Sequence, residues 1–259
     1  MTGGTEATRA AGAPGPLGRP GPLAGKVALI TGSARGQGEV TARRFVAAGA
    51  QVMITDILAA EGAKVAASLG DAAVFQELDV SDETAWAAAV AALRASFGRL
   101  DVLVNNAAIH WIRPLLEDNA ADLDRLLAVN LRGPFLGIQA CVPLMLEGDG
   151  GSIINIASIA GVKAFRGHGV YGAAKWGLRG MSKVAALELA PRIRVNCILP
   201  GAIDSPMLPP GAAERVSAGT PMGRLGRSDE IAEGALYLAS AASSYTTGTD
   251  LVIDGGSTT

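Results

Sequence analysis

The chain has 259 residues and a formal net charge of −2, and 49% of its residues are hydrophobic. This composition excludes disorder of the whole chain, and the near-neutral charge argues against a nucleic-acid binder or a membrane-surface binder. Two cysteines exclude a disulfide scaffold, only two histidines argue against a metal site, and no apolar run approaches the roughly 18 residues of a membrane span. We therefore expect a cytoplasmic protein with no metal, nucleic-acid or membrane partner.

The first 22 residues differ in composition from the rest. They are mainly Gly, Pro, Ala and Thr, with no periodicity and no apolar core of a secretory signal. We interpret residues 1–22 as a disordered extension, with a transit peptide as the alternative. Residues 23–259 show no break in composition and are interpreted as one domain.

Short apolar runs alternate with longer Ala-rich stretches after Lys26. The strands predicted in chain order are Val27–Thr31, Gln51–Thr55, Ala73–Leu78, Leu100–Asn105, Ser152–Ala157, Arg194–Leu199 and Leu251–Ile253. The predicted helices are Gly38–Ala48, Ala59–Leu69, Asp82–Phe97, Leu123–Leu146, Tyr171–Leu189 and Asp229–Ala239. Alternation of this kind predicts an α/β fold, in which a parallel sheet has helices on both faces.

Several residues predict where the helices begin, bend or end. Ser81 and Ser228 are predicted to be N-caps, because acidic residues that suit a helix N-terminus follow each of them. Pro191 is expected to end the helix before it. Pro143 is expected to kink or end the fourth helix, and a kink is the preferred interpretation.

A glycine-rich segment, TGSARGQG at residues 31–38, joins the first strand to the first helix. Gly32, Gly36 and Gly38 let the backbone turn tightly and approach a diphosphate, and the helix N-terminus beyond them favours an anion. A tight strand–helix turn without a ligand is the alternative. Asp56 ends the second strand, where a carboxylate can accept hydrogen bonds from ribose hydroxyls. Together these features predict a dinucleotide site.

A second group of polar residues follows the fifth strand. Ser158 ends that strand, and Tyr171 and Lys175 are four residues apart on one helix face. A nearby ammonium lowers the pKa of a phenol from its usual value near ~10. The pair is therefore expected to act as an acid/base near neutral pH, although such pairs are commonly solvent-exposed helix surface.

Five motifs in this order resemble the short-chain dehydrogenase/reductase family, in its single-domain branch of about 250 residues. They are Gly32/Gly36/Gly38, Asn105-Asn106-Ala107, Ser158, YGAAK at 171–175 and Pro200-Gly201. The resemblance covers residues 23–259. It implies a doubly wound, Rossmann-like sheet of seven parallel strands, a nicotinamide cofactor and a homotetramer. The motifs look most similar to those of bacterial NAD-dependent hydroxysteroid and alicyclic alcohol dehydrogenases.

The resemblance also implies roles for individual residues. Tyr171 would be the acid/base, Lys175 would lower its pKa, Ser158 would bind the substrate oxygen, and Asn130 would link Lys175 to a water relay. The residues implied to bind the cofactor are Gly32, Arg35, Gly36, Gln37, Gly38, Asp56, Ile57, Asp79, Val80, Asn106, Ala107, Tyr171, Lys175, Pro200, Gly201, Ile203 and Ser205.

Two positions depart from the family pattern. Ala108 stands where the family usually has glycine, and we expect its methyl group to be tolerated. Gln37 replaces an aliphatic residue, and it could reach either the diphosphate or the substrate side.

The substrate side is predicted from position along the chain. His110 and Trp111 follow a strand end, and His168 precedes Tyr171, so each could line a cleft or lie in solvent. Residues 204–224 read either as a surface loop or as a mobile lid, and we favour a lid that brings Met207 to the substrate. Cys141 and Cys197 are expected to be buried small hydrophobes.

The sequence therefore predicts an NAD(H)-dependent enzyme that interconverts a secondary alcohol and a ketone, on an alicyclic or steroid-like substrate. NAD(H) is preferred over NADP(H) because Asp56 would repel a 2′-phosphate, although Arg35 would attract one. One alternative is a catalytically silent nucleotide-sensing or scaffolding protein of the same fold. Another is an epimerase or dehydratase of the family's extended branch, which normally carries a larger C-terminal region.

Overall fold

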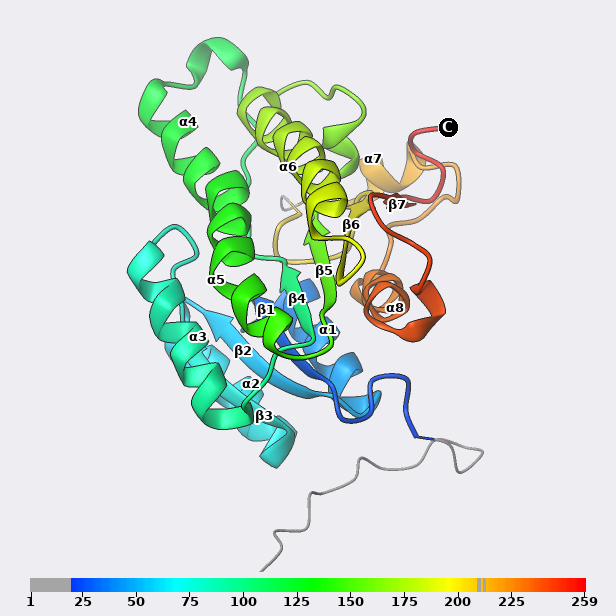
Figure 1. Cartoon of the computed structure of the whole chain (residues 1–259). Helices are drawn as coiled ribbons and strands as arrows, with labels where there is room; N and C mark the ends of the chain where they lie inside the picture. Colours follow the sequence, from blue (N-terminus) through cyan, green and yellow to red (C-terminus); the bar gives the residue numbers. More distant parts are fainter. Residues whose placement is uncertain (1–19, 209–210, 212) are drawn as a thin grey trace, which may run out of the picture.

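The computed structural model describes residues 20–208, 211 and 213–259, and these form one parallel sheet of seven strands (Figure 1). The strand order is β3-β2-β1-β4-β5-β6-β7. The strands are β1 Val27–Thr31, β2 Gln51–Asp56, β3 Ala73–Glu77, β4 Val102–Asn105, β5 Gly151–Ile156, β6 Ile193–Pro200 and β7 Asp250–Ile253. The predicted doubly wound α/β fold with seven parallel strands is confirmed.

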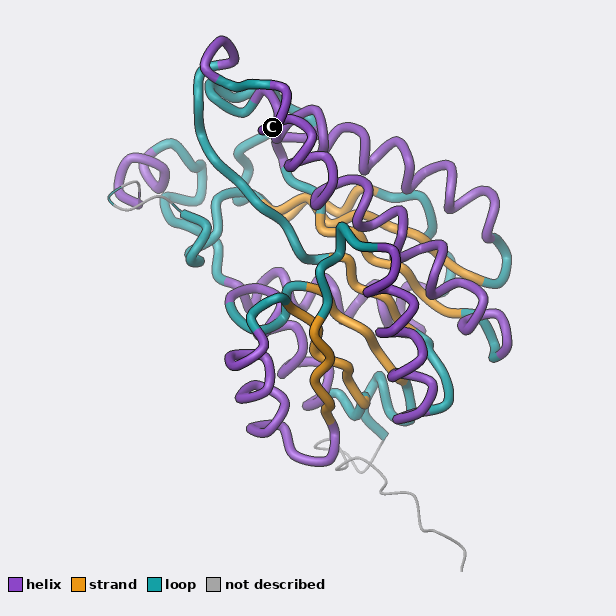
Figure 2. Tube along the Cα trace, turned by 90° about the vertical axis from the view of Figure 1, so that its left-hand side faces the viewer, coloured by secondary structure: helices purple, strands orange, loops and turns teal. Residues whose placement is uncertain are grey.

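Helices cover both faces of this sheet (Figure 2). They are α1 Gly36–Ala47, α2 Ala59–Leu69, α3 Glu83–Phe97, α4 Ala120–Leu127, α5 Gly133–Glu147, α6 Gly169–Leu189, α7 Ala213–Ala218 and α8 Ser228–Ala239. Alternate residues of β1 show how the two cores form. Ala28 and Ile30 pack in the core beneath α1, α2 and α8, while Val27 and Leu29 pack in the core beneath α3, α5 and α6. A strand buried on both faces has apolar residues on both sides, as β1 has from Val27 to Ile30.

The predicted fourth helix is two helices joined by a wider turn. α4 begins at Ala120 because Asn119 caps it, and a π turn at Ala128–Arg132 leads into α5. α5 continues through Pro143 to Glu147, so this proline does not end the helix. By length and composition alone Ala120–Glu147 could cross a membrane, but it packs as two helices of the domain, with 44% of its most apolar window buried.

Both predicted N-caps were wrong by one residue. Asp82 caps α3, where its carboxylate accepts a hydrogen bond from the Thr84 amide at 2.8 Å. Ser81 instead donates its hydroxyl to Asp79. Arg227 holds the N-cap position of α8, and the Glu230 carboxylate accepts its amide, which makes Ser228 the first helical residue. A carboxylate accepts such hydrogen bonds as well as a hydroxyl does, so Asp82 caps α3 from the N-cap position and Glu230 caps α8 from inside the helix.

The predicted extension, residues 1–22, falls mostly outside the described residues. The described chain is already packed at Leu23, which is buried and donates its amide to the Ala48 carbonyl at 3.0 Å. α6 ends at Leu189, two residues before Pro191, as expected. Cys141 and Cys197 are buried, and Trp86 packs in the core beneath α3.

Candidate active site

A cavity of about 830 Å³ crosses the carboxyl ends of the strands. Such a position is typical of ligand sites in open α/β sheets. Most of the predicted site residues line this cavity: Gly32, Arg35, Gly36, Gln37, Asp56, Ile57, Asp79, Val80, Asn106, Ala107, Ser158, Tyr171, Lys175, Pro200, Gly201 and Ser205, and on the substrate side His110, Trp111 and Met207. One elongated cavity therefore joins the two groups of residues predicted from sequence.

The glycine-rich turn forms one wall of the cavity. Gly32 and Gly36 have φ angles of 64° and 60°, a backbone region that glycine adopts without strain. A Cβ at Gly38 would lie 2.2 Å from the Gly32 carbonyl oxygen, so the start of α1 packs directly beneath the turn. The Asn106 side chain donates hydrogen bonds to the carbonyls of Thr31 and Gly32 at 2.9 and 3.0 Å. Gly38 thus supports the turn from below and is not among the lining residues.

The turn and the start of α1 suit a diphosphate. Arg35 is the N-cap residue of α1 and its side chain makes no capping hydrogen bond within the described part of the chain. Amides of a first helical turn that no side chain caps remain available to an anion, and the helix dipole favours negative charge there. The residues present therefore fit the dinucleotide expected from the sequence.

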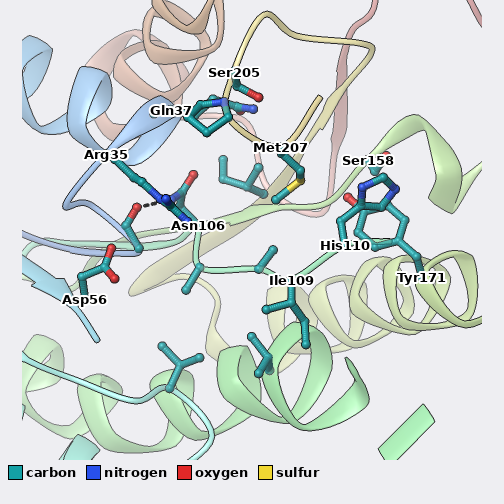
Figure 3. A pocket seen from close by; sticks show the side chains of 18 of the residues that line it. Arg35, Gln37, Asp56, Asn106, Ile109, His110, Ser158, Tyr171, Ser205 and Met207 are labelled. Carbon is teal, nitrogen blue, oxygen red and sulfur yellow. Dashed lines mark hydrogen bonds between the residues drawn. The ribbon is translucent and has the colours of Figure 1, made fainter. Parts of the chain in front are cut away.

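Asp56 lies at the end of β2, with its carboxylate fixed beside the cavity. One carboxylate oxygen accepts a hydrogen bond from the Ala34 amide at 3.0 Å, and the other accepts one from the Leu58 amide at 3.1 Å. Figure 3 shows Asp56 and Arg35 at one end of the cavity and Ser158 and Tyr171 at the other. A carboxylate in this place would meet the ribose of a dinucleotide whose diphosphate lies on the glycine-rich turn.

Tyr171 and Lys175 lie on α6 and reach the end of the cavity opposite Asp56, which we call its inner end. Tyr171 is buried, and the Lys175 ammonium lies 5.6 Å from the centre of its ring. The ammonium donates a hydrogen bond to the Ile156 carbonyl at 2.8 Å, at the end of β5. Ser158 follows β5 and faces Tyr171, as Figure 3 shows. Three of the four residues predicted to be catalytic, all except Asn130, are therefore brought together.

The expected lowering of the Tyr171 pKa is not found in the protein alone. Burial raises the pKa of Tyr171 to about 12, and a hydrogen bond with the Ser158 side chain opposes this rise. Burial also lowers the pKa of Lys175 to about 8. Desolvation penalises the charged form of each group, and it is the largest cause of both pKa shifts.

Asn130 is buried in the π turn between α4 and α5. Its side-chain oxygen accepts the Ile109 amide at 2.9 Å, and its side-chain nitrogen donates to the Ile109 carbonyl at 2.8 Å. The amide thus fixes the backbone just before His110. Both groups of the Asn130 side chain therefore bond to the Ile109 backbone, and Asn130 itself is not among the residues that line the cavity.

Aromatic side chains surround the inner end of the cavity. The His110 ring meets the Tyr171 ring edge-on, with 4.6 Å between ring centres, and the His168 ring lies 5.1 Å from His110. The pKa of His110 is lowered to about 4, first by burial and then by repulsion from His168 and Lys175. His110 is therefore a neutral imidazole at neutral pH. Trp111 donates its indole N–H to the Asp118 carboxylate at 3.0 Å, which fixes this part of the wall.

Besides Gly38 and Asn130, two further predicted residues do not line this cavity. Ile203 is buried, and it borders a separate small cavity of about 80 Å³ together with Met222 and Ile253. Ile203 packs in the core beneath α1, α2 and α8 and is not among the residues that line the large cavity, so its role as a cofactor residue stays a prediction. His168 is not among the lining residues, although its ring lies 5.1 Å from that of His110.

Other lining residues were not predicted. Ile109, Leu78, Ser81 and Ile156 lie near strand ends that the sequence does reveal, so the same signal could have found them. Arg125, Ala128 and Val129 come from α4 and the π turn, which carry no ligand-binding motif. Ala108 lines the cavity, so its methyl group is accommodated there.

Comparison with known proteins agrees with this geometry. Residues 32–258 match a family model described as enoyl-(acyl carrier protein) reductase. The chain is 45% identical to trans-4-hydroxycyclohexanecarboxylate dehydrogenase of Sinomonas cyclohexanicum, over 91% of this chain and 94% of that protein. It is 46% identical to a 3-alpha-(or 20-beta)-hydroxysteroid dehydrogenase of Mycobacterium bovis, over 91% of this chain and 90% of that protein.

A solved structure extends the likeness to the fold. The 3-ketoacyl-(acyl-carrier-protein) reductase of Brucella melitensis, crystallised with NADH, superimposes with a TM-score of 0.88 and is 37% identical. The match covers 92% of this chain and all of that one. The bound NADH agrees with the cofactor expected from the sequence. The chain belongs to the short-chain dehydrogenase/reductase family and is an oxidoreductase that acts on CH–OH groups.

Proposed function

We propose that this protein is an NAD(H)-dependent dehydrogenase that interconverts a secondary alcohol and a ketone, with Tyr171 as the acid/base. The observation that carries the proposal is the convergence of Ser158, Tyr171 and Lys175 at the inner end of the cavity. The glycine-rich turn and Asp56 form the other end. Cofactor and substrate would thus meet at the phenol.

The cofactor and the side chains have separate roles in the reaction, hydride transfer and proton transfer. NAD(H), when bound, supplies or accepts the hydride. In ketone reduction Tyr171 donates its proton to the developing alkoxide, and the Ser158 hydroxyl donates a hydrogen bond to the same oxygen. A pKa of about 12 keeps Tyr171 protonated at neutral pH, so the proton donor is ready. In the reverse direction the Lys175 ammonium favours the phenolate that removes the alcohol proton.

The substrate proposed is an alicyclic or steroid-like alcohol. Ile109, Trp111 and Met207 line the same cavity as Ser158 and Tyr171 and offer apolar surface to a substrate there. Met207 comes from the predicted lid, residues 204–224, of which 209, 210 and 212 lie outside the described residues. Relatives named for hydroxycyclohexane and hydroxysteroid substrates support this class. We further propose that Asn130 links Lys175 to a chain of water molecules, which returns a proton to Tyr171 after Tyr171 has donated its own.

Location and assembly complete the proposal. A cytoplasmic enzyme is expected, to be checked by cell fractionation. A homotetramer is supported by apolar side chains on the outer faces of α5 and α6, where Phe135, Trp176, Val184 and Leu187 are 44–82% exposed. Clusters of exposed apolar residues commonly mark protein interfaces.

A panel of cyclohexanols, cyclohexanediols and hydroxysteroids, assayed for NADH formation, tests this function. We expect turnover of at least one alicyclic secondary alcohol, and with NAD rather than NADP. The silent nucleotide-sensing alternative predicts NADH binding without turnover of any alcohol or of the matching ketones. Turnover confined to acyclic substrates would remove the proposed substrate class but leave the reaction.

A further inference from the structure

Ser158 is held by the short turn that it begins. It is the N-terminal residue of a 3-10 turn at Ile159–Gly161, and its hydroxyl oxygen accepts the Ala160 amide at 3.0 Å. Its carbonyl accepts the Gly161 amide at 2.9 Å. Because the side chain is bonded to its own turn, the position of this turn decides where the hydroxyl points.

Gly161, at the other end of that turn, lies directly against α6. Its carbonyl accepts a hydrogen bond from the Arg179 guanidinium. A Cβ at residue 161 would come within 2.9 Å of the Arg179 side chain and 3.0 Å of the Lys175 carbonyl. The turn therefore has little freedom to shift while Arg179 stays in place.

Arg179 is itself fixed from the side of β7. It is 16% exposed and donates a second hydrogen bond to the Asp250 carboxylate at 2.7 Å. Lys183 lies 3.0 Å from the same carboxylate, and the Trp176 ring covers the guanidinium at 5.4 Å. A planar guanidinium can hold two acceptors at fixed angles, which a lysine ammonium on a flexible stem cannot.

The spacing along α6 connects this arrangement to the reacting centre. Tyr171, Lys175 and Arg179 follow one another at intervals of four residues, so they lie on successive turns of one helix face. Tyr171 and Lys175 reach the cavity, whereas Arg179 is not among its lining residues and reaches the Ser158 turn instead. One helix thus carries the acid/base and the residue that fixes its hydrogen-bonding partner.

We propose that Arg179, held by Asp250, is a positioning residue that sets the Ser158 hydroxyl against Tyr171 and the substrate oxygen. This inference rests on the proposed function. Arg179 would touch neither substrate nor cofactor, and its whole effect on the reaction would pass through Ser158. That property separates it from a residue that only stabilises the fold.

A double-mutant cycle tests this. Arg179→Met keeps the apolar stem and removes the guanidinium, and Ser158→Ala removes the hydroxyl. Arg179→Met should lower kcat about tenfold, as small displacements of reacting groups do. In the Ser158→Ala background it should lower kcat by less than about twofold, because residues that act through one contact are not additive. The dissociation constant for NADH should not change in either background.

The pH profile gives a second readout. The hydrogen bond from Ser158 lowers the pKa of Tyr171, so its loss should move the profile of alcohol oxidation to higher pH. Arg179→Met and Ser158→Ala should shift the profile in the same direction. A merely structural role for Arg179 would leave it in place.

Matched variants complete the experiment. Lys183 contacts the same carboxylate but not the Ser158 turn, so the Lys183→Met variant should keep the wild-type kcat. Should Arg179→Met fail to fold, Asp250→Asn takes its place in the cycle, and a smaller loss that disappears in the Ser158→Ala background is expected. Equal losses in both backgrounds overturn the inference while the proposed function stands. A wild-type protein that turns over no secondary alcohol overturns both.

Discussion

At the scale of single residues, burial decides the charges around the reacting centre. It raises the pKa of Tyr171 to about 12 and lowers those of Lys175 and His110 to about 8 and 4. Each group is shifted toward its neutral form, as desolvation requires. At neutral pH the protein alone therefore presents a phenol, a neutral imidazole and an ammonium.

His110 should make the fold sensitive to acid. Its folded pKa lies below the ordinary value of 6.5, so between pH 6.5 and about 4 the unfolded chain binds a proton that the folded chain does not. Its contribution to stability is thus complete above pH 6.5 and is lost as the pH falls toward 4. His110→Asn should show a smaller drop in Tm than the wild type over this range, measured by calorimetry. Parallel Tm curves for the two proteins would show that His110 titrates normally in the folded state.

Asp56 should determine the choice of cofactor. Two unit charges about 4 Å apart, at an effective dielectric of about 20, interact by about 4 kcal/mol, and with a 2′-phosphate this interaction is repulsive. We expect kcat/KM for NAD(H) to exceed that for NADP(H) by at least ~10²-fold, or about 2.7 kcal/mol. Asp56→Ala should lower the ratio of kcat/KM for NAD(H) to that for NADP(H). Asp79 follows β3, the next strand, and Asp79→Ala should leave this ratio nearly unchanged. Equal use of both cofactors by the wild type would mean that Asp56 does not meet the ribose.

At the scale of elements, the strands were predictable because a buried parallel strand appears as an uninterrupted apolar run. Each of the seven begins and ends within two residues of its predicted bounds. The π turn at Ala128–Arg132 could not be predicted, because it coincides with contacts between Asn130 and Ile109, which are distant in sequence. For the same reason Arg125 and Val129 were missed as lining residues, whereas groups at the strand ends were found.

The glycine-rich turn offers a test at this scale. An alanine at Gly38 would place a methyl group 2.2 Å from the Gly32 carbonyl oxygen and 2.6 Å from the Asn106 side chain. Backbone cannot move aside cheaply, so the turn must shift away from α1. Gly38→Ala should weaken NADH binding at least about tenfold, by fluorescence titration, and lower Tm. Gly180→Ala on α6, where a Cβ meets nothing within 4 Å, is the control and should retain wild-type binding. Unchanged NADH binding in Gly38→Ala would show that the turn does not hold the cofactor.

At the scale of the whole molecule, the outer faces of α5 and α6 predict assembly. A hollow between α4, α5 and α6 is lined by Leu127, Leu131, Phe135 and Met181, with Gly177 allowing close approach. Light scattering at micromolar concentration should give the mass of a tetramer, and Phe135→Glu should give a smaller species. Lys64→Glu, an exposed charge on α2, should not alter the mass. A monomeric wild type would contradict the proposed assembly.

The central claim is that this molecule is an enzyme whose proton donor is Tyr171, rather than a nucleotide-binding protein of the same fold. Tyr171→Phe keeps the ring and its packing against His110 and removes only the hydroxyl. The decisive measurement is kcat for an alicyclic alcohol together with the NADH dissociation constant, on wild type and this variant. We predict a loss of ~10²–10⁴-fold in kcat, with the NADH dissociation constant unchanged within about twofold. Substantial turnover by Tyr171→Phe would contradict it and would place the proton donor elsewhere in the cavity.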